Sequence, residues 1–254
     1  GLIRFDSTAT SVSGVKIDNN RILDLNLASG PAAVVWLDGA SPRVLDITNN
    51  FFSTSSVNGR ANCVLLGLAT SAAHVSKISG NTLLSSGVVS PTTAIYGNIT
   101  SAGTLHVTDN RIQNVVGAVD VYGIYITGSV NSKVDNNLIE AVSAVGAGPV
   151  TGIYVGSATA SSVTGNTVRG ISSTTASSLN SVIRIVEPVK VRVTSNTLEG
   201  STNVVNTLYA ATTAAVPICS IAIIGNTIVG GTETTGHIYV TTAVNSAWNG
   251  LTVH

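Results

Sequence analysis

Apolar and polar residues alternate in short runs along most of the chain, and one eight-residue pattern recurs eight times. It reads apolar, any residue, Ile or Val, two small or polar residues, Asn, any residue, apolar, as in residues 15–22, 105–112, 191–198 and 221–228. The repeated asparagines, 27 to 31 residues apart by subtraction of their numbers, are Asn20, Asn50, Asn81, Asn110, Asn137, Asn166, Asn196 and Asn226. Such a regular period is typical of a solenoid.

Each repeat contains three strand-like pieces. In the first, alternation places Val15 and Ile17 inward and Lys16 outward. Asn or Gly residues follow, and because they tolerate a left-handed backbone they predict a sharp turn. A second short strand leaves this turn. A third carries Ile or Leu followed by a large residue, as in Ile124-Tyr125. No window keeps a helical period of 3.6 residues for more than two turns.

This organisation predicts an all-β fold, a single-stranded right-handed parallel β-helix of about eight coils, each of about 30 residues and three strands. Residues 1–254 then form one β-helix domain, in which 1–14 and 241–254 are partial or irregular coils. Neither end resembles a capping helix, which favours a fragment of a longer chain. We expect the repeated asparagines to stack in register and to bond to one another from coil to coil.

Composition excludes several classes of partner. Charged residues are 9% of the 254 residues and the net charge is +0, which argues against a nucleic-acid partner held by counterion release. No apolar run approaches the roughly 20 residues that span a membrane, so no membrane insertion is predicted. The four histidines are scattered over different coils, and neither a metal nor another cofactor is predicted.

The two cysteines are predicted to be buried structural thiols. Cys63 and Cys219 lie about five repeats apart, which separates them by more than about 20 Å in stacked coils and excludes a disulfide within one chain. Both have apolar sequence neighbours, as is usual for buried cysteines.

Repeats such as residues 163–168 and 223–228 resemble those of right-handed β-helix proteins of the pectate-lyase-like superfamily. Within it they are most similar to the central domain of bacteriophage tailspikes and capsule depolymerases. The pattern covers nearly the whole chain and is specific for the fold, whereas the fold hosts lyases, hydrolases, epimerases and adhesins. The resemblance implies a homotrimer, a bacterial polysaccharide bound along the outer face of one sheet, and a place in the virion tail or outside the cell.

The third strand offers a candidate substrate-binding surface. Its large residues share one parity and are predicted to point outward: Trp36, Tyr96, Tyr125, Tyr154, Arg184, Tyr209 and Tyr239. Five of the six tyrosines of the chain belong to this set. Exposed aromatic rings suit the apolar faces of sugars. A structural aromatic ladder or a trimer interface explains the same pattern.

Catalysis by a glycosidase needs two carboxyl groups roughly 5–10 Å apart. Asp120 precedes the third strand of its coil and Glu187 follows that of a coil two further on, so they are the first candidate pair. Glu140 and Glu199 are the reserve pair, although Arg169 between them favours a surface ion ladder. The third strand lacks the aspartate cluster that binds calcium in pectate lyases, which favours a glycoside hydrolase over a metal-dependent lyase.

Two functions are compatible with these features. The first is a tailspike-type β-helix that binds a bacterial surface polysaccharide and, if an acid pair operates, depolymerises it. The alternative is a non-catalytic structural stalk or adhesin. The tyrosine pattern favours the first, and the low charge and missing metal ligands favour the second.

Overall fold

The computed structural model describes most of the chain, and every regular element in it is a strand. The described residues are 2–5, 14–27, 32–38, 44–56, 61–68, 74–87, 91–99, 103–128, 131–156, 160–188, 190–200, 202–212, 219–229, 236–242 and 248–254. They contain 26 strands and no helix.

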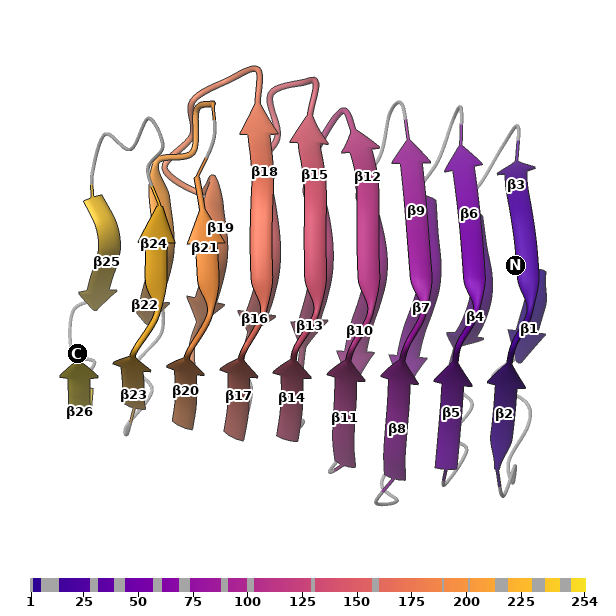
Figure 1. Cartoon of the computed structure of the whole chain (residues 1–254), viewed down its shortest axis with the longest axis horizontal. Helices are drawn as coiled ribbons and strands as arrows, with labels where there is room; N and C mark the ends of the chain where they lie inside the picture. Colours follow the sequence, from indigo (N-terminus) through magenta and orange to yellow (C-terminus); the bar gives the residue numbers. More distant parts are fainter. Residues whose placement is uncertain are drawn as a thin grey trace.

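The strands form three parallel sheets that together make a right-handed parallel β-helix (Figure 1). Sheet A contains β1 (Ile3–Phe5), β4 (Ala32–Asp38), β7 (Ala61–Leu68), β10 (Thr92–Ile99), β13 (Val121–Thr127), β16 (Val150–Gly156), β19 (Ser181–Val186), β22 (Asn206–Thr212) and β25 (Gly236–Thr242). Sheet B contains β2 (Val15–Asp18), β5 (Val44–Thr48), β8 (His74–Ser79), β11 (Gly103–Thr108), β14 (Asn131–Asp135), β17 (Ala160–Thr164), β20 (Lys190–Thr194), β23 (Cys219–Ile224) and β26 (Trp248–Val253). Sheet C contains β3 (Arg21–Leu27), β6 (Phe51–Ser56), β9 (Thr82–Gly87), β12 (Arg111–Gly117), β15 (Leu138–Ala144), β18 (Thr167–Ser173), β21 (Thr197–Glu199) and β24 (Thr227–Val229).

Each coil runs through sheets B, C and A in that order, so the predicted fold class and the three strands per coil are confirmed. The sequence predicted about eight coils. In the described part of the chain, sheets A and B contain nine strands each and sheet C contains eight. At the two ends, β1 pairs with β4 and β26 pairs with β23, and both pairs are parallel. Of the predicted partial coils 1–14 and 241–254, the structure describes residues 2–5, 14, 241–242 and 248–254. The remaining residues of both segments lie outside the described ranges.

The turn from sheet B to sheet C uses a left-handed backbone in every coil, as the Asn and Gly residues predicted. The residue before each repeated asparagine has a φ of 55° to 67°; these residues are Asn19, Asn49, Gly80, Asp109, Asn136, Gly165, Ser195 and Gly225. This bend points the following asparagine side chain along the axis of the helix, toward the next coil.

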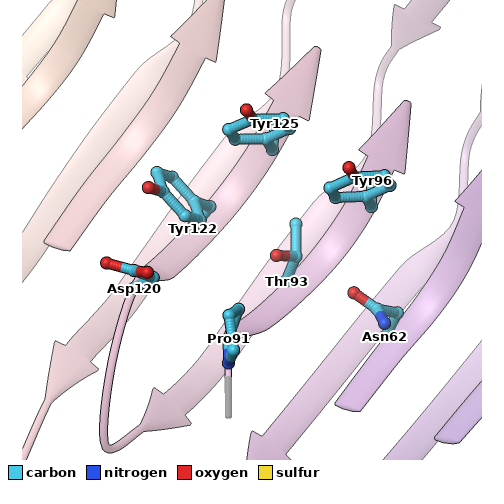
Figure 2. Close-up of a pocket in the computed structure, with 7 residues that line it drawn as sticks. All are labelled: Asn62, Pro91, Thr93, Tyr96, Asp120, Tyr122 and Tyr125. Carbon is cyan, nitrogen blue, oxygen red and sulfur yellow. The ribbon is translucent and has the colours of Figure 1, made fainter. Parts of the chain in front are cut away.

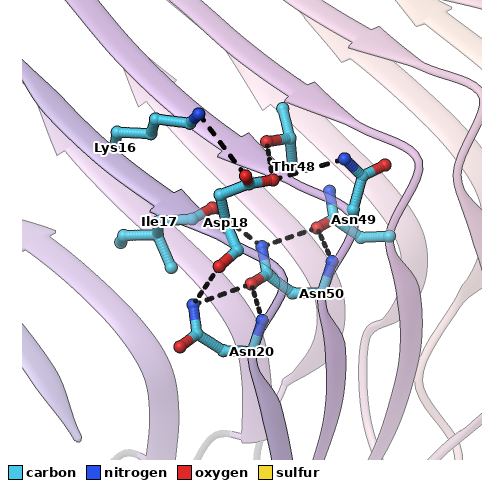
Figure 3. A network of polar contacts seen from close by, with 8 residues as sticks. Lys16, Ile17, Asp18, Asn20, Thr48, Asn49 and Asn50 are labelled. Carbon is cyan, nitrogen blue, oxygen red and sulfur yellow. Dashed lines mark hydrogen bonds and ion pairs between the residues drawn. The ribbon is translucent and has the colours of Figure 1, made fainter.

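The repeated asparagines form a continuous hydrogen-bonded ladder (Figure 3). The backbone N–H and the side-chain Nδ2 of Asn50 both donate to Oδ1 of Asn81, each at 2.9 Å. Asn50 Nδ2 also donates to the carbonyl oxygen of Ile17 at 2.9 Å. The same pair of bonds to Oδ1 joins each successive asparagine from Asn20 to Asn226, at 2.8 to 3.1 Å. The predicted amide ladder is therefore confirmed.

Inward residues of the sheets stack into apolar columns. In sheet B, Ile17, Ile47 and Ile78 occupy successive positions in register, and all three are buried. Lys16, next to Ile17, is exposed, as the alternation predicted. Each fully buried aliphatic side chain contributes roughly 1.5–3 kcal/mol, so these columns supply much of the stability of the coils.

Cys63 is buried in sheet A, and its thiol is free. Its Sγ donates to the carbonyl oxygen of Leu84 at 3.0 Å, and burial raises the pKa of the thiol well above its ordinary value. The prediction of a buried structural thiol is confirmed here, whereas the side chain of Cys219 lies outside the described part.

Candidate functional site

The large third-strand residues lie in one row across sheet A. The register pairs each with its neighbour in the next coil, in the order Trp36, Leu65, Tyr96, Tyr125, Tyr154, Arg184, Tyr209 and Tyr239. Leu65 completes this set, which we name the sheet A row. Apart from Leu65, which is buried, these side chains are half-buried.

The centre of the sheet A row is a stack of parallel rings. The ring centroids of Tyr96 and Tyr125 are 5.1 Å apart with an interplanar angle of 2°, and those of Tyr125 and Tyr154 are 4.5 Å apart at 5°. The Arg184 guanidinium lies 5.6 Å from the Tyr154 centroid and 5.4 Å from that of Tyr209. Because neighbouring rings cover both faces of Tyr125, this ring presents edges outward, and a sugar cannot pack on an open face there.

Tyr122 joins this stack, although strict alternation along the strand assigns it to the inside. Its ring meets Tyr125 edge to face, with centroids 4.9 Å apart at 67°, and Tyr154 at 5.8 Å and 72°. Two buried residues, Gly123 and Ile124, separate the half-buried Tyr122 and Tyr125, so alternation is interrupted in β13. A glycine within a strand pattern commonly marks such an irregularity, and Gly123 is the signal that could have identified Tyr122.

A hollow of about 170 Å³ lies beside these rings and crosses β7, β10 and β13 (Figure 2). Its lining comprises Asn62, Pro91, Thr93, Tyr96, Asp120, Tyr122 and Tyr125. Figure 2 shows Asp120 and Tyr122 on one side of Thr93 and Asn62 on the other. We name it the sheet A hollow.

The polar groups of the sheet A hollow are set up for hydrogen bonding. Asn62 is 2% exposed, and within the described part of the chain its Nδ2 has no hydrogen-bond partner. Burial, and after it the negative charge of Asp120, raises the pKa of Tyr122, so its hydroxyl remains protonated at neutral pH. The hollow thus combines an unused amide donor, a neutral phenol and a carboxylate.

Asp120 and Glu187, the first candidate acid pair, are not brought together. Asp120 directly precedes β13, whereas Glu187 directly follows β19, so they lie at opposite ends of the strands of sheet A. Tyr125 is in register with Tyr154 and Arg184. Glu187 therefore lies eight residues further along the strand direction than Asp120, a distance of roughly 20 Å or more. The prediction that this pair has the roughly 5–10 Å spacing of a glycosidase is therefore wrong, because it considered the number of coils between the two residues and not their positions along the strands.

Glu140, of the reserve pair, is held in an ion network on sheet C. Gln113 Nε2 donates to its Oε2 at 2.8 Å, Arg169 Nε donates to its Oε1 at 2.8 Å, and the Arg169 Nη2 also donates to Oε1. These bonds, with that from Arg169 the largest cause, lower the pKa of Glu140. Glu199 continues the same register beyond Arg169. A carboxyl group kept ionised in this way is a poor proton donor, and the arrangement is that of an ion ladder.

The lowered pKa of Glu140 predicts a small pH dependence of stability. A depressed folded-state pKa contributes stability above the ordinary value of 4.5, and this contribution is lost as the pH falls through the folded-state pKa. We expect Glu140→Gln to lower the thermal midpoint slightly at about pH 7 and to match the wild type at about pH 3. Glu199→Gln, beyond Arg169 in the same register, should change the midpoint less, because Arg169 donates its hydrogen bonds to Glu140. A difference that grows on acidification would contradict the network.

The described residues include no group of three or more His, Cys, Asp or Glu side chains that could hold a metal ion. They also include no helix that is long and apolar enough to cross a membrane.

The parallel β-helix of the structure agrees with the fold that the repeat pattern predicted. No family model, no curated protein and no solved structure matches the chain. The structure shows the β-helix, and a relation to the pectate-lyase-like superfamily or to tailspikes stays a proposal.

Proposed function

We propose that this chain is a β-helical shaft that binds a bacterial surface polysaccharide at the sheet A hollow. The observation that carries the proposal is the buried, unpartnered amide nitrogen of Asn62, which lines a hollow shared with Asp120 and Tyr122. A buried donor without a partner costs about 1–3 kcal/mol. A sugar with one hydroxyl that accepts from Asn62 and another that donates to Asp120 would recover that energy.

Other unpartnered donors extend this surface along the sheet A row. The Nε1 of Trp36 and the Nε of Arg184 are buried atoms that have no hydrogen-bond acceptor among the described residues. They lie on β4 and β19, on either side of the sheet A hollow. A chain of sugars crossing successive coils would pass all three donors, which supports a polymer rather than a single sugar as ligand.

Binding, rather than cleavage, is what these residues support best. Asp120 and Glu187 are too far apart to act on one glycosidic bond, and Glu140 is engaged with Arg169. From the resemblance to tailspikes we further propose a parallel homotrimer located in a virion tail or outside the cell. Sedimentation of the intact protein at micromolar concentration tests the trimer, and a monomer would contradict it.

A structural stalk is the second candidate. The observation that favours it is the ring stack itself, in which Tyr96, Tyr125 and Tyr154 cover one another's faces. Such a ladder stabilises neighbouring strands without any ligand.

Two variants at the sheet A hollow test glycan binding. Tyr122→Phe removes only the hydroxyl, and Asp120→Asn removes the charge while keeping the shape. We expect each to weaken binding to the best ligand in a panel of capsular polysaccharides by roughly 2–10-fold, the scale of one hydrogen bond. Calorimetric titration gives the affinities, and the thermal midpoint should stay near that of the wild type.

Asp109→Asn is the matched control for Asp120→Asn, because Asp109 also has a positive φ but is an exposed residue of the turn from sheet B to sheet C and does not line the hollow. Its affinity should equal that of the wild type. No binding to any polysaccharide of the panel, or equal affinity in all variants, would leave the stalk as the better function. Release of reducing ends from a bound polysaccharide would contradict the non-catalytic interpretation.

A further inference from the structure

Sheet B carries a second hollow, of about 270 Å³, on a face that the proposed function does not use. Its walls come from β14 and β20, and β17 lies between these strands, as Figure 1 shows. Three of its nine lining residues are cations, Lys133, Lys190 and Arg192, and none of the nine is acidic. We name it the sheet B hollow.

The register explains why a hollow forms here. Lys133, Ser162 and Arg192 are successive residues of one outward row, so a small side chain lies between two long ones. Ala160, two residues before Ser162, is a second small residue on β17. It pairs with Asn131 of β14, and the next residue, Ser161, pairs with Val191 of β20. Small side chains on β17 therefore form the bottom of the hollow, and the longer cationic side chains of β14 and β20 flank it.

The three cations are available for a ligand. Lys133, Lys190 and Arg192 are all exposed, and none of them forms an ion pair with another described residue. Strands two apart are separated by roughly 10 Å. Long Lys and Arg side chains on both walls can therefore reach one oxyanion between them, through charge-assisted hydrogen bonds of about 2.8 Å.

The surroundings of the sheet B hollow carry few compensating negative charges. His106 pairs in register with Lys133, and its pKa is lowered by burial and, next, by the charge of Lys133. Asp135, one row away, accepts a hydrogen bond from the Ser162 hydroxyl at 3.3 Å. Burial raises the pKa of Asp135, whereas the Ser162 hydrogen bond and the charge of Lys133 lower it, so this carboxylate offsets part of the positive charge of Lys133. A cluster of like charges over a low floor creates a local positive potential that attracts anions, although the whole chain has a net charge of +0.

We propose that the sheet B hollow binds a tetrahedral oxyanion, a sulfate or phosphate group, between Lys133 and Arg192. The group is either a free anion or an ester carried by a polymer, since both present the same oxygens. This site lies on a different sheet from the sheet A hollow and does not depend on glycan binding there.

Calorimetric titration of the full chain at constant ionic strength tests the site. The probes are sodium sulfate, sodium phosphate, glucose 6-sulfate and glucose 6-phosphate, with glucose as the neutral reference. We expect at least one charged probe to bind and glucose not to bind. Arg192→Gln should lower that affinity about fivefold or more, because it removes a charge-assisted contact.

Filling the floor separates a shaped site from a merely basic surface. Ser162→Gln keeps every cation and places a longer side chain in the hollow, so we expect an affinity loss as large as that of Arg192→Gln. Ala222→Gln is the matched control, because Ala222 follows Arg192 in the same row but does not line the hollow. It should bind like the wild type. Ala160→Gln, which also keeps every cation and lengthens a side chain that lines the hollow, provides the same test if the Ser162 variant does not fold.

The relative affinities then identify the source of the anion. Esters that bind about tenfold tighter than the free anions indicate a polymer-borne group, and equal affinities indicate a free anion. The proposal is overturned if no charged probe binds the wild type. It is also overturned if Arg192→Gln and Ser162→Gln both bind with wild-type affinity.

Discussion

Replacing Asn137 by Ala is expected to lower the free energy of unfolding by about 3–5 kcal/mol. Oδ1 of Asn137 accepts both the backbone N–H and the Nδ2 of Asn110, each at 3.0 Å. Its Nδ2 donates to the carbonyl oxygen of Val107 at 2.8 Å and to Oδ1 of Asn166 at 3.0 Å. Alanine removes these four bonds and a fifth, from Nδ2 to the carbonyl oxygen of Asp135 at 3.1 Å. Because Asn110, Asn137 and Asn166 are 0 to 1% exposed, water cannot replace them.

Asn20→Ala is the matched control for this loss. Asn20 begins the ladder and is exposed, so water can take over the bonds that it loses. We expect a cost of about 1 kcal/mol or less. Urea unfolding followed by far-ultraviolet circular dichroism measures both variants. Equal losses at the two positions would show that the ladder contributes through turn conformation and not through buried amide bonds.

The ladder also explains why the fold was readable from the sequence. An asparagine at 27 to 31 residue intervals, preceded by a residue that accepts a positive φ, defines one turn in each coil. Alternation on either side, as around Ile17 and Ile47, then determines which residues face inward. Period, turn and parity are all local properties, so the coil and its sheet register follow from them.

The candidate site was less predictable because it depends on where alternation fails. Parity along β13 assigns Tyr122 to the inside, yet its ring packs on Tyr125 at the surface. A Cβ at Gly123 would lie 2.7 Å from the carbonyl oxygen of Gly152, so the backbones approach too closely there for any side chain. A lone glycine in the sequence indicates such a place but does not say how the flanking side chains turn.

Positions along the strands were the other source of error. Counting coils placed Asp120 and Glu187 near each other across sheet A, although one lies before a strand and the other after a strand. The sheet B hollow was missed for a related reason. Lys133 and Arg192 are far apart in the sequence, and only the strand register places them on either side of Ser162.

Tyr125→Ala is the second variant with a large expected effect, a loss of about 2–4 kcal/mol in the free energy of unfolding. Tyr125 contacts three rings, with centroid distances of 5.1 Å to Tyr96, 4.5 Å to Tyr154 and 4.9 Å to Tyr122. Each such pair contributes about 0.5–1.5 kcal/mol beyond area burial. Thermal and urea unfolding measure the loss, and Tyr125→Phe, which keeps the ring, should lose about 1.5 kcal/mol or less, the scale of one hydrogen bond.

Tyr239→Ala serves as the control, because among the described rings Tyr239 stacks only on Tyr209, at 5.6 Å and 26°. It should cost about 1 kcal/mol. The comparison also separates the two roles of the sheet A row. A ring that sugars contact from outside would lose glycan affinity without losing stability when replaced by Ala. Because the rings of Tyr96 and Tyr154 cover both faces of Tyr125, we expect the opposite order, and an unchanged stability of Tyr125→Ala would contradict the ladder.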